Sequence, residues 1–151
     1  MRVLVDGDSA GHRDLLVALA VETQVELVWV HNPSQRPPYP EPGLPIRLTV
    51  HLADAAAQAA DMVLMNMAAA GDIVVTGDLG LASVCVAKGA AAISPRGFWY
   101  RHEDLMQRLE WRALGERLKR GGVHLDHKPP RKRLDDWRFE QELRQALSPE
   151  G

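Results

Sequence analysis

Residues 71–78, Gly-Asp-Ile-Val-Val-Thr-Gly-Asp, indicate the fold class of this chain. Ile73 to Thr76 form a continuous apolar and β-branched run, which is typical of a strand buried on both faces of a parallel sheet. Gly77-Asp78 comes directly after this strand, at its carboxyl end. Leu81 to Lys88 then predicts a helix with Gly89 as its C-cap. A buried strand that runs through a polar turn into a helix predicts an α/β fold.

Similar units lie on both sides of this stretch. Strands alternating with helices predict a parallel sheet, because a helical crossover returns the chain to the same edge. The apolar runs and periodicities predict four more strands and three further helices. The strands are Arg2 to Val5, Val25 to Val30, Ile46 to Val50 and Ala91 to Ser94, and the helices are Arg13 to Glu22, 102–119 and 134–147.

Two segments are expected to be loops, and one helix has an uncertain start. His31 to Pro45 contains six of the ten prolines, which excludes a helix or a central strand. Residues 121–133 are predicted to form a mobile loop. The Ala-rich run between Leu52 and Met67 has the apolar spacing of an amphipathic helix. Asp61 faces solvent if this helix begins at His51, but reaches the sheet edge if it begins near Ala59.

The composition describes one soluble domain spanning residues 1–151. The chain has 46% hydrophobic residues and a formal net charge of -2, and its length allows a single sizeable core. The lone Cys85 excludes a disulfide framework within the chain and favours a reducing compartment. Asp6 and Asp8 interrupt any signal-like apolar start, and no apolar segment is long enough to span a membrane. We therefore expect a cytoplasmic protein without a membrane partner.

Charge is unevenly distributed along the chain. Residues 1–95 carry ten acids against five bases, whereas residues 96–133 carry five acids against eleven bases. A basic segment of this kind is able to meet phosphates, so RNA is a candidate partner. A solvated helix face followed by a basic loop is the simpler interpretation. The sequence leaves open whether the chain forms a homo-oligomer.

Carboxylates follow two of the predicted strands at the edge where ligands bind in parallel α/β sheets. Asp6 follows the first strand, and Asp78 follows the strand that ends at Thr76. Asp8 lies in the same loop as Asp6. Asp61 lies in the Ala-rich helical run that comes before the strand leading to Asp78. Hard cations such as Mg²⁺ and Mn²⁺ prefer oxygen ligands of this kind. The alternative is that Asp6 and Asp78 only cap helices or close turns.

Several stretches in order resemble the YaiI/YqxD family of small bacterial proteins, which is placed in the PIN-like nuclease superfamily. The resemblance covers nearly the whole chain and is strongest from Asp61 to Gly97. The stretches are Val5-Asp6-Gly7-Asp8, Ala60-Asp61, residues 71–78 with Leu81-Ala82, Lys88-Gly89-Ala90-Ala91 and Pro95-Arg96-Gly97.

The resemblance implies a three-layer α/β/α sandwich with a central, mainly parallel sheet. It also implies that Asp6, Asp61 and Asp78, with Asp8 adjacent, bind Mg²⁺ or Mn²⁺ and cleave phosphodiesters, most often in RNA. In such a site the metal activates a water, and Asp61 or Asp8 orients it. Thr76 and Arg96 are candidates to contact the substrate phosphate, although Arg96 has an equal claim to a structural salt bridge.

Departures from the family pattern keep other functions open. Ser9-Ala10-Gly11 replaces a Cys-Pro that family members typically carry, and Gln58 stands where many have Asp. The loss of that carboxylate favours a non-catalytic RNA-binding or regulatory protein as the alternative to a nuclease. A phosphatase acting on a small molecule is a third hypothesis, because the same acids suit any phosphate ester.

Overall fold

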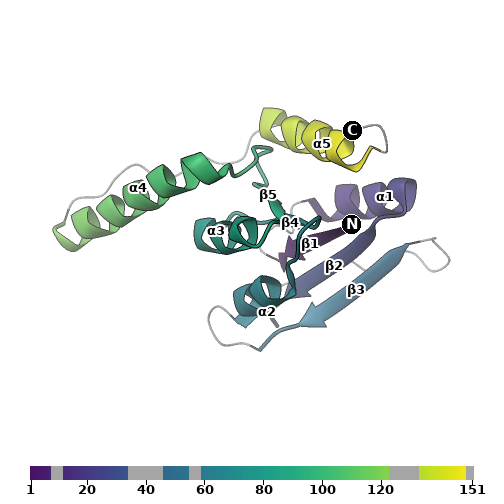
Figure 1. Ribbon diagram of the computed structural model, residues 1–151, viewed down its shortest axis with the longest axis horizontal. Coiled ribbons are helices and arrows are strands. Elements are labelled where there is room, and N and C mark those ends of the chain that lie inside the picture. The colour runs from purple at the N-terminus through teal and green to yellow at the C-terminus, as the bar shows by residue number, and fades with distance from the viewer. Residues whose placement is uncertain (8–11, 34–45, 55–58, 123–132, 149–151) are drawn as a thin grey trace.

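The computed structural model describes residues 1–7, 12–33, 46–54, 59–122 and 133–148. Five strands form one sheet in the order β3-β2-β1-β4-β5 (Figure 1). Every pair of neighbouring strands is parallel. The strands are β1 (Arg2–Asp6), β2 (Glu26–His31), β3 (Arg47–Leu52), β4 (Ile73–Val75) and β5 (Ala91–Ile93). The predicted α/β fold with a parallel sheet is confirmed.

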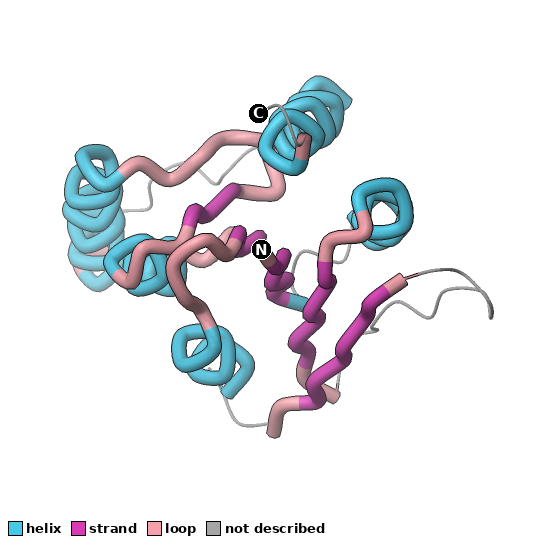
Figure 2. Tube along the Cα trace, turned by 45° about the vertical axis from the view of Figure 1, so that its right-hand side comes forward, coloured by secondary structure: helices cyan, strands magenta, loops and turns pink. Residues whose placement is uncertain are grey.

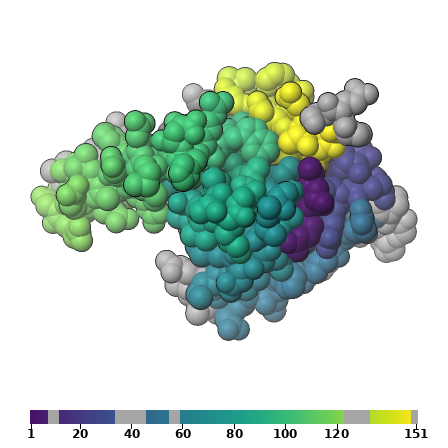
Figure 3. All heavy atoms as spheres, viewed as in Figure 1, coloured from purple at the N-terminus to yellow at the C-terminus, as the bar shows by residue number. Residues whose placement is uncertain are grey.

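Helices cover both faces of the sheet, which gives the expected three-layer sandwich (Figure 2). Helices α1 (Arg13–Thr23) and α5 (Arg133–Leu147) pack on one face. Helices α2 (Ala59–Met67) and α3 (Leu79–Ala87) and the first turns of α4 (His102–Arg120) pack on the other. The remaining length of α4 extends away from the body of the molecule (Figures 1 and 3).

The alternation of side chains along β1 builds both halves of the core. Val3 and Val5 contact the cluster under α1 and α5, while Leu4 between them contacts the cluster under α2 and α3. Successive residues of a strand point to opposite faces, so a central strand covered on both sides must be apolar throughout. Trp29 of β2 is fully buried on the α1 and α5 side.

The described elements refine several sequence-based boundaries. His51 belongs to β3 and α2 begins at Ala59 among the described residues, so Asp61 lies in the first helical turn. This outcome matches the second of the two alternatives for the helix start. Helix α3 begins two residues before the predicted Leu81. Most of the Pro-rich loop and of the predicted loop at 121–133 lies outside the described residues.

Helix α5 is held by a turn that follows β5. Gly97 has φ +89°, and a β-carbon placed on it would lie 2.5 Å from the backbone nitrogen of Phe139. Only glycine permits this approach, because any side chain would collide with the helix backbone. Trp99 Nε1 also donates a hydrogen bond to Glu142 Oε2 at 3.0 Å. Trp99 therefore helps to fix α5 against the sheet.

Within the described ranges, none of the helices combines the length and the apolar character that crossing a membrane requires.

Candidate functional site at the carboxyl edge of the sheet

Strand register brings three polar residues level at the carboxyl edge of the sheet. Val5 of β1 pairs with Val75 of β4, so Asp6 and Thr76 are the next residues of adjacent strands. Ser94 follows β5, and the Thr76 N–H donates to the carbonyl of Ile93 just before it, at 3.1 Å. Asp6 is 2% exposed and Thr76 is 0% exposed. The carboxyl edge of the sheet therefore contains a buried carboxylate, that of Asp6.

The side chain of Thr76 links the two acids that the sequence singled out. Thr76 Oγ1 donates a hydrogen bond to Asp6 Oδ2 at 3.0 Å. The backbone N–H of Asp78 donates to the same Oγ1, also at 3.0 Å. The expected substrate contact of Thr76 stays a prediction, but its observed contacts position Asp6 and the chain that carries Asp78. Asp6 and Asp78 are therefore brought to one corner of the molecule.

Asp78 also caps helix α3. Its Oδ1 accepts a hydrogen bond from the N–H of Leu81 at 3.0 Å, as an N-cap carboxylate does. The simpler interpretation of Asp78 as a capping residue is thus observed. Capping fixes the orientation of the carboxyl group and does not exclude a second role.

Tyr100 lies next to Thr76 at this edge. Its hydroxyl donates a hydrogen bond to the carbonyl of Thr76 at 3.0 Å. Burial raises the pKa of Tyr100, and the charge of Asp78 acts in the same direction, whereas a hydrogen bond from Ser94 and the charge of Arg108 lower it. Asp78 and Arg108 therefore lie within electrostatic range of the same phenol.

Two arginines of α4 reach this corner, and the sequence analysis did not place them there. The guanidinium carbon of Arg108 lies 4.5 Å from the ring centre of Phe98, a cation–π contact. Phe98 in turn contacts the Tyr100 ring edge to face at 5.3 Å. A β-carbon placed on Gly80 would lie 3.3 Å from Asp78 Oδ1 and 4.0 Å from Arg112 Nη1. Positive charge therefore stands beside the acidic edge.

The predicted cluster of Asp6, Asp61 and Asp78 is not assembled as one group. No three His, Cys, Asp or Glu side chains within the described ranges are placed to hold a metal ion together. Asp61 is half-buried in the first turn of α2 and makes an interaction of its own. Asp8 lies outside the described residues. What the described part brings together is Asp6, Thr76 and Asp78.

Arg96 forms an ion pair with a residue of helix α5. Its Nη1 is 3.7 Å from Asp135 Oδ2, and its backbone N–H donates to Ser94 Oγ at 3.1 Å. The neighbouring Pro95 carbonyl lies 2.7 Å from His12 Nε2. The structural salt bridge weighed for Arg96 is thus formed, and its contact with substrate stays a prediction.

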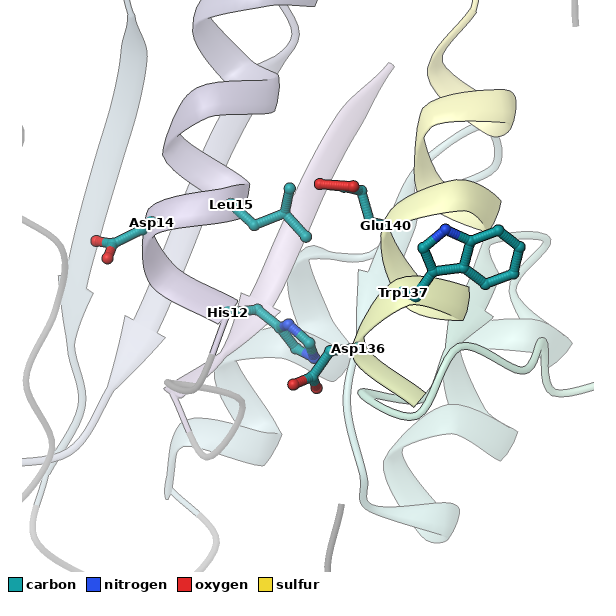
Figure 4. Close-up of a pocket in the computed structure, with 6 residues that line it drawn as sticks. All are labelled: His12, Asp14, Leu15, Asp136, Trp137 and Glu140. Atoms are coloured by element: carbon teal, nitrogen blue, oxygen red, sulfur yellow. The ribbon is translucent and has the colours of Figure 1, made fainter. Parts of the chain in front are cut away.

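A pocket of about 360 Å³ opens on the other face of the sheet, between the starts of α1 and α5 (Figure 4). Asp136 and Glu140 extend from α5 toward α1, whereas Asp14 points away from α5. Three carboxylates in one pocket repel a phosphate. The pocket therefore does not extend a phosphodiester site. Its lining residues are His12, Asp14, Leu15, Asp136, Trp137 and Glu140.

Comparison with known protein families gives a match over residues 4–149 to a model described as "Uncharacterized BCR, YaiI/YqxD family". The chain belongs to the YaiI/YqxD family. This finding confirms the resemblance seen in the sequence, and the match spans almost all of the chain. No solved structure gave a significant match.

Curated relatives match over nearly their whole lengths, and each is called a UPF0178 protein. The relative from Alkaliphilus metalliredigens is 30% identical over 147 residues, covering 97% of this chain and 92% of its own. That from Desulfotalea psychrophila is 33% identical over 150 residues, covering 98% of each. That from Burkholderia ambifaria is 33% identical over 153 residues, covering 100% of this chain and 99% of its own.

Proposed function

We propose that this YaiI/YqxD protein is a metal-dependent phosphodiesterase that cleaves RNA, with a PIN-like active site at the carboxyl edge of its sheet. The observation that carries the proposal is the linked unit of Asp6, Thr76 and Asp78, in which one hydroxyl joins two acidic positions. Parallel α/β sheets bind their ligands at this edge. Arg108 and Arg112 beside it supply the positive charge that a phosphodiester needs.

The donor set suits Mg²⁺ or Mn²⁺. Mg²⁺ is usually held by one or two carboxylates, with waters and substrate phosphate as its other ligands. Asp6 and Asp78 are the two proposed ligands, and Asp61 or Asp8 is proposed to orient a water. When bound, the metal would activate that water and stabilise the charge that develops on the phosphate. Thr76 would keep the Asp6 carboxylate in position through its 3.0 Å hydrogen bond.

Cleavage of end-labelled single-stranded RNA tests this proposal. Purified protein is incubated with Mn²⁺, Mg²⁺ or EDTA, beside the Asp78→Asn variant. Asparagine is as good an N-cap as aspartate, so this change keeps the α3 cap and removes the charge. We expect cleavage only with metal, and a loss of at least about 100-fold in the variant, the size seen when one group that stabilises transition-state charge is removed.

A matched control removes two carboxylates elsewhere. The Asp14→Asn/Asp136→Asn variant changes the acidic pocket between α1 and α5 and is expected to cleave RNA as the wild-type protein does. Cleavage that survives EDTA, or that is equal in the Asp78→Asn and wild-type proteins, would refute the proposal.

A second candidate is a non-catalytic RNA-binding or regulatory protein of the same fold. The observation that favours it is the absence of a three-residue metal group in the described part of the chain. Gln58, where many family members have Asp, points the same way. This candidate predicts RNA binding that weakens steeply with salt and no cleavage under any metal. Changing Gln58 to Asp is then the first attempt to restore activity.

A further inference from the structure

A row of basic side chains follows one side of α4. Three of them, together with Leu105, lie within roughly 60° of arc on a helix of 3.6 residues per turn. Leu105 lies in the same arc and is buried, so this is the side of α4 that faces the body where the helix begins. We call this row the α4 basic stripe, and it consists of Arg108, Arg112 and Lys119.

The stripe begins beside the acidic edge and continues outward. Arg108 is stacked on Phe98, and Arg112 approaches Gly80, two residues after Asp78. Beyond this point α4 leaves the body, so its last turns stand in solvent (Figure 3). At 1.5 Å per residue the distance from Arg108 to Lys119 is about 16 Å along the helix. A row of this length matches a chain of several phosphates better than it matches a single phosphate.

The helix dipole does not explain the two arginines in the middle of α4. Arg117, Lys119 and Arg120 are in the last turn, where cations stabilise any helix. Arg108 and Arg112 lie more than a turn from either end of the helix. The dipole acts only within the first and last turns, so it does not account for their positions.

The distribution of acids indicates a one-sided contact. Glu103 and Glu110 lie on the side of α4 opposite the stripe. A helix inserted into the major groove of a duplex has phosphates on both sides, so these carboxylates would be repelled there. A single strand lying along the stripe avoids Glu103 and Glu110 and meets the cations, with Glu116 paired to Arg112 at the border of the stripe. The charges therefore fit one phosphodiester chain better than a duplex.

We propose that the α4 basic stripe binds the backbone of a single-stranded nucleic acid and leads it past Asp78, an inference that rests on the phosphodiesterase function proposed above. Arg112 and Arg108 hold the phosphates next to the acidic edge, and Lys119 holds the strand farther out. The substrate is then a polymer, and a small phosphate ester does not use the stripe. RNA and DNA share this backbone chemistry, and the experiment separates them.

Binding is measured by fluorescence anisotropy in EDTA, so that neither metal nor cleavage contributes. The probes are end-labelled single-stranded RNA, single-stranded DNA of the same sequence, and the corresponding duplex. The test variant is Arg108→Gln/Arg112→Gln. Its control, Arg117→Gln/Arg120→Gln, removes the same charge from other sides of the same helix.

We expect the test variant to bind single strands at least about 10-fold more weakly than wild type. The slope of log K against log salt should also become shallower by about 1.4, because each phosphate contact on a single strand contributes about 0.7. The losses of affinity and of salt slope in the control variant should each be less than half of those in the test variant. Equal losses in the two variants, no binding by the wild type, or tighter binding of duplex would overturn the proposal.

A charge-preserving variant separates binding from folding, because Arg108 also packs on Phe98. Arg108→Lys/Arg112→Lys keeps both charges and should bind within about 3-fold of wild type. If it binds as weakly as the glutamine variant, packing and not charge is responsible, and the proposal fails. Preference for RNA over DNA by the wild type would identify RNA as the strand that is held.

The two proposals fail in different ways. Binding through the stripe without metal-dependent cleavage would refute the phosphodiesterase proposal and leave the stripe as a binding surface. Metal-dependent cleavage with an unchanged KM for RNA in Arg108→Gln/Arg112→Gln would refute the proposal for the stripe and leave the phosphodiesterase proposal standing.

Discussion

The hydroxyl of Thr76 donates a hydrogen bond to Asp6 Oδ2 at 3.0 Å, between two strands that lie side by side. The same oxygen accepts the N–H of Asp78 at 3.0 Å. A single buried hydroxyl thus fixes one acid through its side chain and another through its backbone. Fixed placement of this kind is what a site that stabilises charge requires.

Thr76→Val tests this link with a side chain of nearly the same shape. Valine removes both hydrogen bonds and leaves polar groups buried with fewer partners, which costs about 1–3 kcal/mol in the free energy of unfolding. Urea denaturation measures the change. Thr76→Ser keeps the hydroxyl and should retain most of the lost stability. Equal stability of the valine variant and the wild type would show that Thr76 does not bind Asp6 in solution.

Much of the fold could be predicted because its signals are local. Ile73 to Val75 are buried on both faces, so the strand is apolar at every position and visible in the sequence. Asp6 ends β1 and Asp78 lies three positions after the last residue of β4, and the carboxyl ends of parallel strands share one edge. Strand type and chain direction were therefore enough to place these two acids at the same side of the molecule.

Long-range packing could not be predicted in this way. Arg112 approaches Gly80 only because α4 packs across α3, and no local pattern records that crossing. The spacing of residues 108, 112 and 119 does place them on one helix side, and that signal was present in the sequence. Arg96 illustrates the converse, because its ion pair with Asp135 depends on where a distant helix docks.

Gly97→Ala is expected to weaken the docking of α5. A positive φ alone costs an L-residue about 1–2 kcal/mol, and the collision with the backbone of Phe139 adds about 1–3 kcal/mol of overpacking. Gly71→Ala is a matched control, since Gly71 has φ +91° and nothing within 4 Å of the added carbon. Thermal or urea unfolding should show the larger loss for Gly97→Ala, and equal losses would contradict the close approach.

Asp72 makes stability depend on pH. Burial raises its pKa, but hydrogen bonds from Arg2 and from the N–H of Ala69, with the charge of Arg2, outweigh burial and hold the pKa below the usual value. A depressed carboxyl pKa stabilises the fold above the unfolded pKa of about 4, and this contribution is lost as pH falls through the folded value.

Urea midpoints measured on either side of about pH 4 test this dependence. Asp72→Asn should be less stable than wild type near neutral pH, and the difference should shrink as the solution becomes more acidic. The Arg2 and Asp72 pair lies at the amino ends of the strands, away from Asp78, so cleavage should be unaffected at temperatures where the variant is folded. A difference in stability that is constant with pH would contradict the lowered pKa.

Cys85 is expected to be inert in the folded protein. Burial raises the pKa of its thiol to about 11, and the charge of Lys88 only partly opposes this. The thiolate is the reactive form, and Cys85 is fully buried in α3. A disulfide exchange reagent such as dithionitrobenzoate should react rapidly in urea and very slowly in native buffer. Rapid reaction in native buffer would show that α3 opens readily.

Glu116 is expected to restrain the α4 basic stripe. Its Oε1 lies 3.6 Å from Arg112 Nε, one turn along the helix, so it competes with a phosphate for that guanidinium. Glu116→Gln should tighten the binding of single-stranded RNA several-fold in EDTA. Glu110→Gln removes the same charge from the opposite side of the helix and should have a smaller effect. Anisotropy at low salt distinguishes them, because screening at high salt removes the difference. Equal tightening in both variants would mean that only the net charge of the helix matters, and that Arg112 does not meet the strand.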